Sequence, residues 1–161
     1  MVKSYTISSI IVLFGLIITL FLPWIKIINN SYSMLGIILE GEDLYNAMKK
    51  DGEPFIIELP EEIYNFIWMI LTSAVLYVLA IILAIVGSKN RLGLLAASAS
   101  TLGSALLFLS AYEYYKTYIS DLLGPMAFII GDLVVLGIGP YIALLIGGLG
   151  IIGYLISHKI D

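Results

Sequence analysis

The sequence contains no cysteine and only one histidine, His158, which lies close to the C-terminal end. Disulfide bonds, thiolate metal sites and cysteine nucleophiles are therefore excluded. A zinc or haem site built from several histidines of one chain is strongly disfavoured. No other catalytic constellation stands out, so we predict no catalytic residue, no metal site and no cofactor.

Charged residues are also scarce. They make up 12% of the 161 residues, whereas hydrophobic residues make up 60%. A soluble domain carries roughly 25% charged residues, so this composition is typical of a membrane protein. The net charge of −4 and the lack of a basic patch disfavour a nucleic-acid partner. Abundant Ile, Leu, Tyr and Gly without Cys resembles the composition of thermophilic archaeal membrane proteins.

The longest uncharged run, residues 63–87, predicts a membrane-spanning helix. Its 25 residues would reach about 37 Å as a helix, which exceeds the hydrocarbon core of a bilayer. Three further spans are predicted at about residues 5–25, 92–115 and 139–157. A signal peptide is the alternative for the first, but its apolar run is long and no small-residue cleavage site precedes Pro23.

The basic residues predict the orientation of these spans. Lys3, Lys89, Arg91 and Lys159 lie close to span ends on one side, whereas the lysines of the other side are spread over longer loops. The positive-inside rule then places both termini in the cytoplasm, with the chain in the cell membrane. We predict one domain, residues 1–161: an all-α membrane protein with a left-handed four-helix transmembrane bundle and a small extracellular β/α cap.

The cap is predicted from the first outer loop, residues 26–62. Strand-like residues occur at 24–28 and 55–59, and residues 42–50 place acids before lysines, as the helix dipole favours. Glycine and proline interrupt the second outer loop, residues 116–138, where we expect a strand at 133–138 and packing against the cap. A re-entrant segment within residues 119–140 is the alternative.

Small residues at helical spacing mark the third and fourth spans. Such residues let helix backbones approach closely in lipid, so we predict a tight seam between these two helices. Two alternatives remain: these stripes form an oligomer interface, or hydroxyl residues line a pore. The seam residues are Gly93, Ala96, Ser100, Gly103, Ala143, Gly147 and Gly150, and the pore residues would be Thr72, Ser73, Ser98, Ser100, Thr101 and Ser104.

Aromatic residues lie at the ends of the first and third spans. We predict that Trp24, Tyr112 and Tyr115 anchor the chain at the membrane interface, where aromatic side chains are enriched. Glu113 lies among these tyrosines and near Lys116, which favours a solvated or paired interface acid over a proton-relay residue. The same interpretation applies to Asp121 and Asp132.

The layout resembles the claudin-type tetraspan arrangement: a short first segment, a span followed by Trp24, a longer partly β outer loop, a tight basic inner turn and a shorter outer loop. FLPWIKI (residues 21–27), the later Gly36 and Gly41, and the glycine-rich run at residues 137–153 resemble small prokaryotic four-span proteins of uncharacterised role. The paired outer-loop cysteines and the Trp…Gly-Leu-Trp pattern of claudins are missing. The resemblance therefore implies an architecture but no junction or pore function.

These observations favour a non-catalytic structural or interaction protein that acts by lateral assembly in the membrane or through its outer cap. Its partners would be the lipid bilayer, itself or other membrane proteins. An accessory subunit of a larger respiratory or transport complex is the alternative, and a channel or transporter is the third hypothesis. An enzyme is the least favoured interpretation.

Overall fold

The computed structural model describes residues 3–27, 30–40, 60–124 and 134–160. Its long helices are α1 (Ser4–Phe21), α3 (Glu61–Gly87), α4 (Arg91–Leu123) and α6 (Gly139–Ile160). Three short strands accompany them: β1 (Pro23–Ile27), β2 (Asn30–Ser33) and β3 (Val134–Leu136). Residues 34–40 form a further helical segment.

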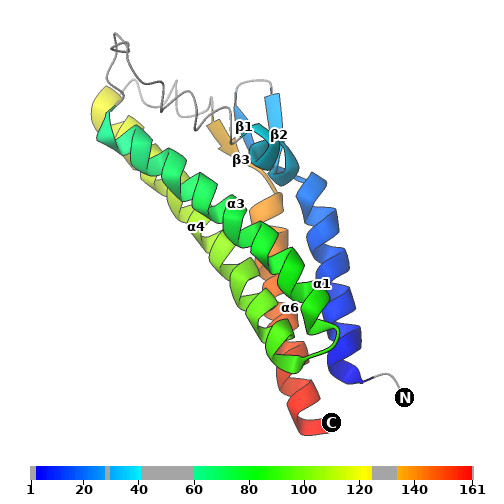
Figure 1. Ribbon diagram of the computed structural model, residues 1–161. Helices are drawn as coiled ribbons and strands as arrows, with labels where there is room; N and C mark the ends of the chain where they lie inside the picture. Colours follow the sequence, from blue (N-terminus) through cyan, green and yellow to red (C-terminus); the bar gives the residue numbers. More distant parts are fainter. Residues whose placement is uncertain (1–2, 28–29, 41–59, 125–133, 161) are drawn as a thin grey trace, which may run out of the picture.

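The helices form a bundle in which the chain runs up, down, up and down (Figure 1). Each helix packs against two neighbours in the circular order α1, α3, α4, α6, and the contact between α3 and α4 is the most extensive. The two termini and the α3–α4 turn lie at one end, which we call the terminal end. The strands lie at the opposite end, which we call the sheet end.

Within the described residues, these four helices are long and apolar enough to cross a membrane. Their outward faces carry large apolar side chains, which suits a lipid environment. On α1, for example, the side chains that are at least two-fifths exposed are Ile7, Ile10, Ile11, Phe14, Ile17, Ile18 and Phe21. The four helices and their apolar surface therefore fit a multi-pass membrane protein.

Local sequence explains where the helices begin and end. Pro23 forces Leu22 into an extended conformation, and α1 stops at Phe21. Asn90 accepts a hydrogen bond from the Leu92 N–H at 3.0 Å and caps the start of α4. Gly124 has a positive φ of 51°, a conformation that ends helices and favours glycine.

The sheet joins the two loops that connect the helices at the sheet end. Its strand order is β2-β1-β3, and both pairings are antiparallel. Ile25 pairs with Leu136, and the Gly137 N–H donates to the Trp24 carbonyl at 2.9 Å. The chain segment before α6 is thus held directly against the segment that follows α1.

Several element boundaries differ from those predicted. The first helix ends four residues before the predicted span does, because Pro23 starts a strand. The third helix continues to Leu123, so part of the predicted 116–138 loop is helical. Strand β2 and helical residues 34–40 have no counterpart in the prediction. The cap elements predicted at 42–50 and 55–59, and Asp132, lie outside the described residues.

Candidate functional site: helix seams and the two ends of the bundle

Helix α6 approaches α4 closely at two of the predicted glycines. A Cβ atom on Gly147 would lie 2.7 Å from Leu102 Cγ and 3.1 Å from the Ser98 carbonyl oxygen. A Cβ atom on Gly150 would collide with the Ser98 hydroxyl and lie 2.8 Å from Val12 Cγ2 on α1. No side chain fits at either position without displacing a neighbour, and Ala143 on the same helix is fully buried.

The small residues of α4 divide between two partners. Gly93 faces α3, because its Cβ would lie 2.8 Å from Gly87 Cα. A Cβ on Gly103 would lie 3.6 Å from Leu76 Cδ1, also on α3. Ala96 and Ser100 are half-buried. The predicted single seam between the third and fourth spans is therefore two seams, since α4 packs against α3 as well as α6.

The buried hydroxyls bond to helix carbonyls. Ser98 and Thr101 each donate to the carbonyl four residues earlier, at 2.8 Å. Ser73 on α3 and Ser104 on α4 donate to each other's carbonyl oxygens, also at 2.8 Å. Thr72 is exposed on the outside of the bundle. The six hydroxyl residues proposed for a pore thus do not share one face.

The reciprocal serine pair gives a testable prediction. Ser73→Ala or Ser104→Ala removes one interhelical donor, and each is expected to lower the free energy of unfolding by about 1 kcal/mol. The double variant should lose less than the sum, because the two hydroxyls act as one unit. A double-mutant cycle measured by unfolding in detergent checks this, with the exposed Ser110→Ala as control. Full additivity would contradict the pairing.

Trp24 is fully buried, unlike the exposed side chain that an interface anchor needs. Its indole N–H donates to the Thr19 carbonyl at 2.9 Å. Its ring meets Tyr77 edge-on at a centroid distance of 5.4 Å and Phe108 at 5.1 Å. A Cβ on Gly139 would overlap the indole. Trp24 thus contacts residues of α1, α3, α4 and α6 and closes the bundle core beneath the sheet.

The other two predicted anchors are half-buried. The Tyr112 hydroxyl donates to the Val134 carbonyl at 3.4 Å, which links α4 to β3. The Tyr115 ring packs on Phe66 of α3 at a centroid distance of 4.9 Å. Each therefore makes a specific contact within the chain, and Glu113 beside them is exposed.

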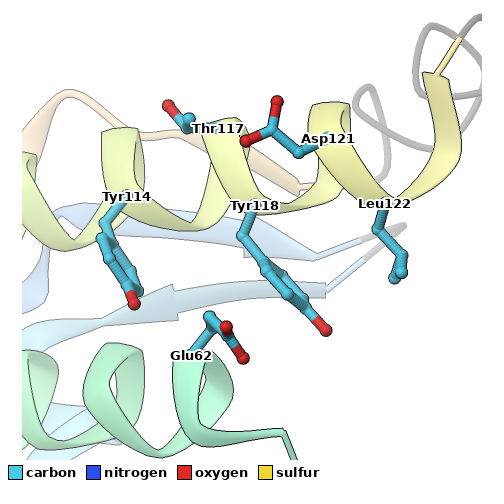
Figure 2. A pocket seen from close by; sticks show the side chains of 6 residues that line it. All are labelled: Glu62, Tyr114, Thr117, Tyr118, Asp121 and Leu122. Carbon is cyan, nitrogen blue, oxygen red and sulfur yellow. The ribbon is translucent and has the colours of Figure 1, made fainter.

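An open hollow lies between the first turn of α3 and the last turns of α4, and we call it the tip hollow. It has a volume of about 400 Å³. Figure 2 shows Tyr114 and Tyr118 directed from α4 toward Glu62 on α3. The residues that line it are Glu62, Tyr114, Thr117, Tyr118, Asp121 and Leu122.

Two carboxylates and two tyrosine rings give the tip hollow a definite chemical preference. Carboxylates attract cations, and aromatic faces bind ammonium and guanidinium groups. No basic residue is among the described residues that line it. No group of three potential metal ligands gathers anywhere in the described part of the chain. The arrangement suits a basic side chain or an organic cation.

Basic residues gather at the other end of the bundle. Lys3, Lys89 and Arg91 line an open hollow there, together with Tyr5, Asn90, Leu92 and Tyr154. His158 and Lys159 occupy the last turn of α6 at the same end. The two ends of the bundle therefore carry opposite charge preferences.

Comparison with known proteins finds no matching family model, curated protein or solved structure.

Three contacts at the terminal end escape the sequence-based interpretation. Tyr5, Thr6 and Ser9 of α1 donate to the carbonyls of Lys89, Ser88 and Ala84 at 3.4, 2.9 and 2.8 Å. These carbonyls belong to the C-terminal turn of α3 and the residues after it, where backbone acceptors lack helical partners. The only feature of the sequence that could have predicted these contacts is the presence of polar residues at the start of the apolar run of α1.

Proposed function

We propose that the chain is a non-catalytic interaction protein of the cell membrane, which binds another membrane protein through the tip hollow. The observation that carries this proposal is the hollow itself: an open, anionic, tyrosine-lined surface with no basic residue of the described chain in it. Tyrosine is enriched at protein interfaces, and a basic side chain of a partner would complement Glu62 and Asp121.

Helix length supports this location. The 33 residues of α4 reach about 50 Å, whereas the 18 residues of α1 reach about 27 Å. A bilayer core of about 30 Å accommodates α1 but leaves roughly 20 Å of α4 outside it. We therefore place the last turns of α4, with the tip hollow, beyond the hydrocarbon, where they meet the exposed loops of other proteins.

The charge distribution supports an orientation with both termini in the cytoplasm. Lys3, Lys89, Arg91, His158 and Lys159 all lie at the terminal end. Positive residues next to spans are retained on the cytoplasmic side, which puts the sheet and the tip hollow outside the cell. In this orientation the sheet corresponds to the extracellular cap of a claudin-like layout, a resemblance that concerns architecture alone.

Lateral self-assembly through the glycine stripes has less support. Gly93 packs on Gly87, and Gly147 and Gly150 pack on Ser98, so these glycines are used within the chain. A second protein that contributes basic groups fits the tip hollow better than a second copy held by the same glycines. The accessory subunit of a larger membrane complex is the form of this function that we favour.

The test is purification from native membranes in mild detergent. Wild-type protein is expected to co-purify with a partner in fixed stoichiometry. The amount of partner that co-purifies with the Glu62→Lys/Asp121→Lys variant should be at least tenfold lower, because two lysines would then face the basic groups of the partner. Glu113→Lys is the matched control, because Glu113 is exposed on the same helix outside the hollow. A partner retained equally by all three proteins, or a pure homo-oligomer, would contradict the proposal.

A further inference from the structure

Residues 34–40 form a helix at the sheet end, and we call it the short helix (Figure 1). One of its faces packs on the bundle. Met34 is fully buried, and Ile37 and Ile38 pack against the core. Residues three and four positions apart lie on the same face of a helix, so these three side chains form a single inner face.

The opposite face of the short helix is apolar as well. Leu35 and Leu39 lie there, also four positions apart, and Leu35 is half-buried whereas Leu39 is 68% exposed. Residues 34–39 include no polar side chain. A helix with one side in water carries polar residues on that side, whereas a helix that is apolar all round is surrounded by protein or lipid. The exposed face of the short helix therefore needs an apolar neighbour.

The length of α1 places this face at the edge of the bilayer core. Ser33, the residue before the short helix, pairs with Pro23, which follows α1. The 18 residues of α1 reach about 27 Å, and at a typical tilt of about 20° they cover about 25 Å of a core that is about 30 Å thick. About 5 Å of hydrocarbon therefore extends past Phe21, to the level at which the short helix begins.

The polar groups at the two ends of the short helix suit this position. The first N–H groups of a helix lack helical partners, and an unpaired N–H is costly away from water. Here the Gly36 N–H donates to the Ser33 hydroxyl at 3.2 Å. Glu40, the first charged residue after Lys26, is exposed at the other end. The apolar run thus stops where the chain leaves the short helix.

We propose that the short helix lies in the membrane, with Leu35 and Leu39 inserted between the acyl chains and the headgroups of the leaflet at the sheet end. Helices at this boundary bury their apolar face by about 5–10 Å, which matches the hydrocarbon left uncovered by α1. Lipid is the occupant because the exposed surface continues the apolar face of α1, which ends at Phe21 with 63% of its side chain exposed.

This inference rests on the membrane location proposed above and not on the partner of the tip hollow. Because the chain has no cysteine, single-cysteine variants of the full chain test it directly. Each variant carries a bimane fluorophore on its cysteine and is reconstituted into phosphatidylcholine vesicles, with or without bromine on the acyl chains near the headgroup. Phe14→Cys is the lipid-facing control, since Phe14 is 65% exposed on α1. Lys116→Cys is the water-facing control, since Lys116 is exposed on the last turns of α4.

Brominated lipid is expected to lower the fluorescence at Leu39→Cys and Phe14→Cys about twofold, and that at Lys116→Cys by less than about 1.2-fold. A water-soluble maleimide should react with unlabelled Leu39→Cys about tenfold more slowly than with Lys116→Cys. Both residues lie at the sheet end, so the orientation of the protein in the vesicles does not change this ratio. Leu35→Cys should also be quenched, and it gives a second measurement if Leu39→Cys fails to fold.

The other results would overturn the proposal in distinguishable ways. Labelling of Leu39→Cys as fast as that of Lys116→Cys would place the short helix in water. Slow labelling without quenching would show that protein covers it, either a second copy or another chain. Quenching at Phe14→Cys but not at Leu39→Cys would leave the membrane location intact and contradict only this inference, whereas no quenching at Phe14→Cys would contradict both.

Discussion

Gly150→Leu is expected to force α6 away from α1 and α4 and to lower the free energy of unfolding by about 3 kcal/mol. A Cβ atom at this position already collides with the Ser98 hydroxyl and lies 2.8 Å from Val12 Cγ2. The rest of a leucine side chain would have to enter the same space. Because the position contacts two helices at once, moving away from one does not relieve the clash with the other.

Gly148→Leu is the matched control for this substitution. A Cβ atom on Gly148 has no neighbour within 4 Å, so its leucine points into open space. Both variants gain the same helix propensity of about 1 kcal/mol, and their difference isolates the packing term. Thermal unfolding in detergent, followed by circular dichroism, measures both. Equal melting temperatures would show that α6 does not pack on α1 and α4 as described.

The glycines of α6 illustrate how much of the fold can be predicted from the sequence. Gly147 and Gly150 lie three residues apart in the uncharged run of residues 139–157, a spacing that indicates close helix approach in lipid. The uncharged runs locate the four long helices for a similar reason, since bilayer thickness fixes the length of a span. In both cases the prediction uses only the spacing of residues or the length of a run along the chain. It does not require knowing which segments pack against each other.

The helix boundaries are predicted less well, because hydropathy indicates where a span leaves the membrane and not where its helix ends. Tyr114, Tyr118 and Asp121 are polar or amphipathic, so hydropathy places the end of the span near residue 115. The backbone continues as a helix to Leu123, where Gly124 supplies the positive φ that ends it. The tip hollow lies on this continuation, and the sequence pattern therefore does not predict it.

The sequence also does not show which residues each buried side chain contacts. On α1 the buried residues are spaced by four and three: Tyr5, Ser9, Val12, Leu16 and Thr19. This spacing identifies a buried face, but it does not say that Ser9 donates to Ala84 or that Thr19 contacts Tyr77. Such contacts depend on how each helix is rotated about its axis. Packings that differ in this rotation can have equal hydropathy, so hydropathy does not select one of them.

Trp24 is the clearest case of one residue type with two structural meanings. A tryptophan after a span usually lies among headgroups, where its amphipathic ring is stabilised. Here Pro23 ends α1 early and starts β1, and the strand turns the indole inward over the bundle. The indole N–H then finds its acceptor in the Thr19 carbonyl, near the end of α1, where carbonyls lack helical partners.

Trp24→Ala is accordingly expected to lower the free energy of unfolding by about 4 kcal/mol, the range seen when a fully buried aromatic side chain is truncated. The indole packs against Tyr77 of α3 and Phe108 of α4, and its N–H bonds to α1. The cavity left by alanine would therefore face several helices, and no single helix can move to fill it. Unfolding in detergent, monitored by circular dichroism, measures the loss.

Trp68→Ala provides the comparison, because Trp68 is 51% exposed and its truncation should cost about 1 kcal/mol or less. Trp24→Phe keeps an aromatic ring but lacks the indole N–H, so it should lie between the two, with a loss of about 2 kcal/mol. If Trp24 were instead an anchor among the headgroups, Trp24→Ala and Trp68→Ala would destabilise the protein equally. The graded order alanine, phenylalanine, wild type at position 24 follows only from a buried indole that both packs and donates.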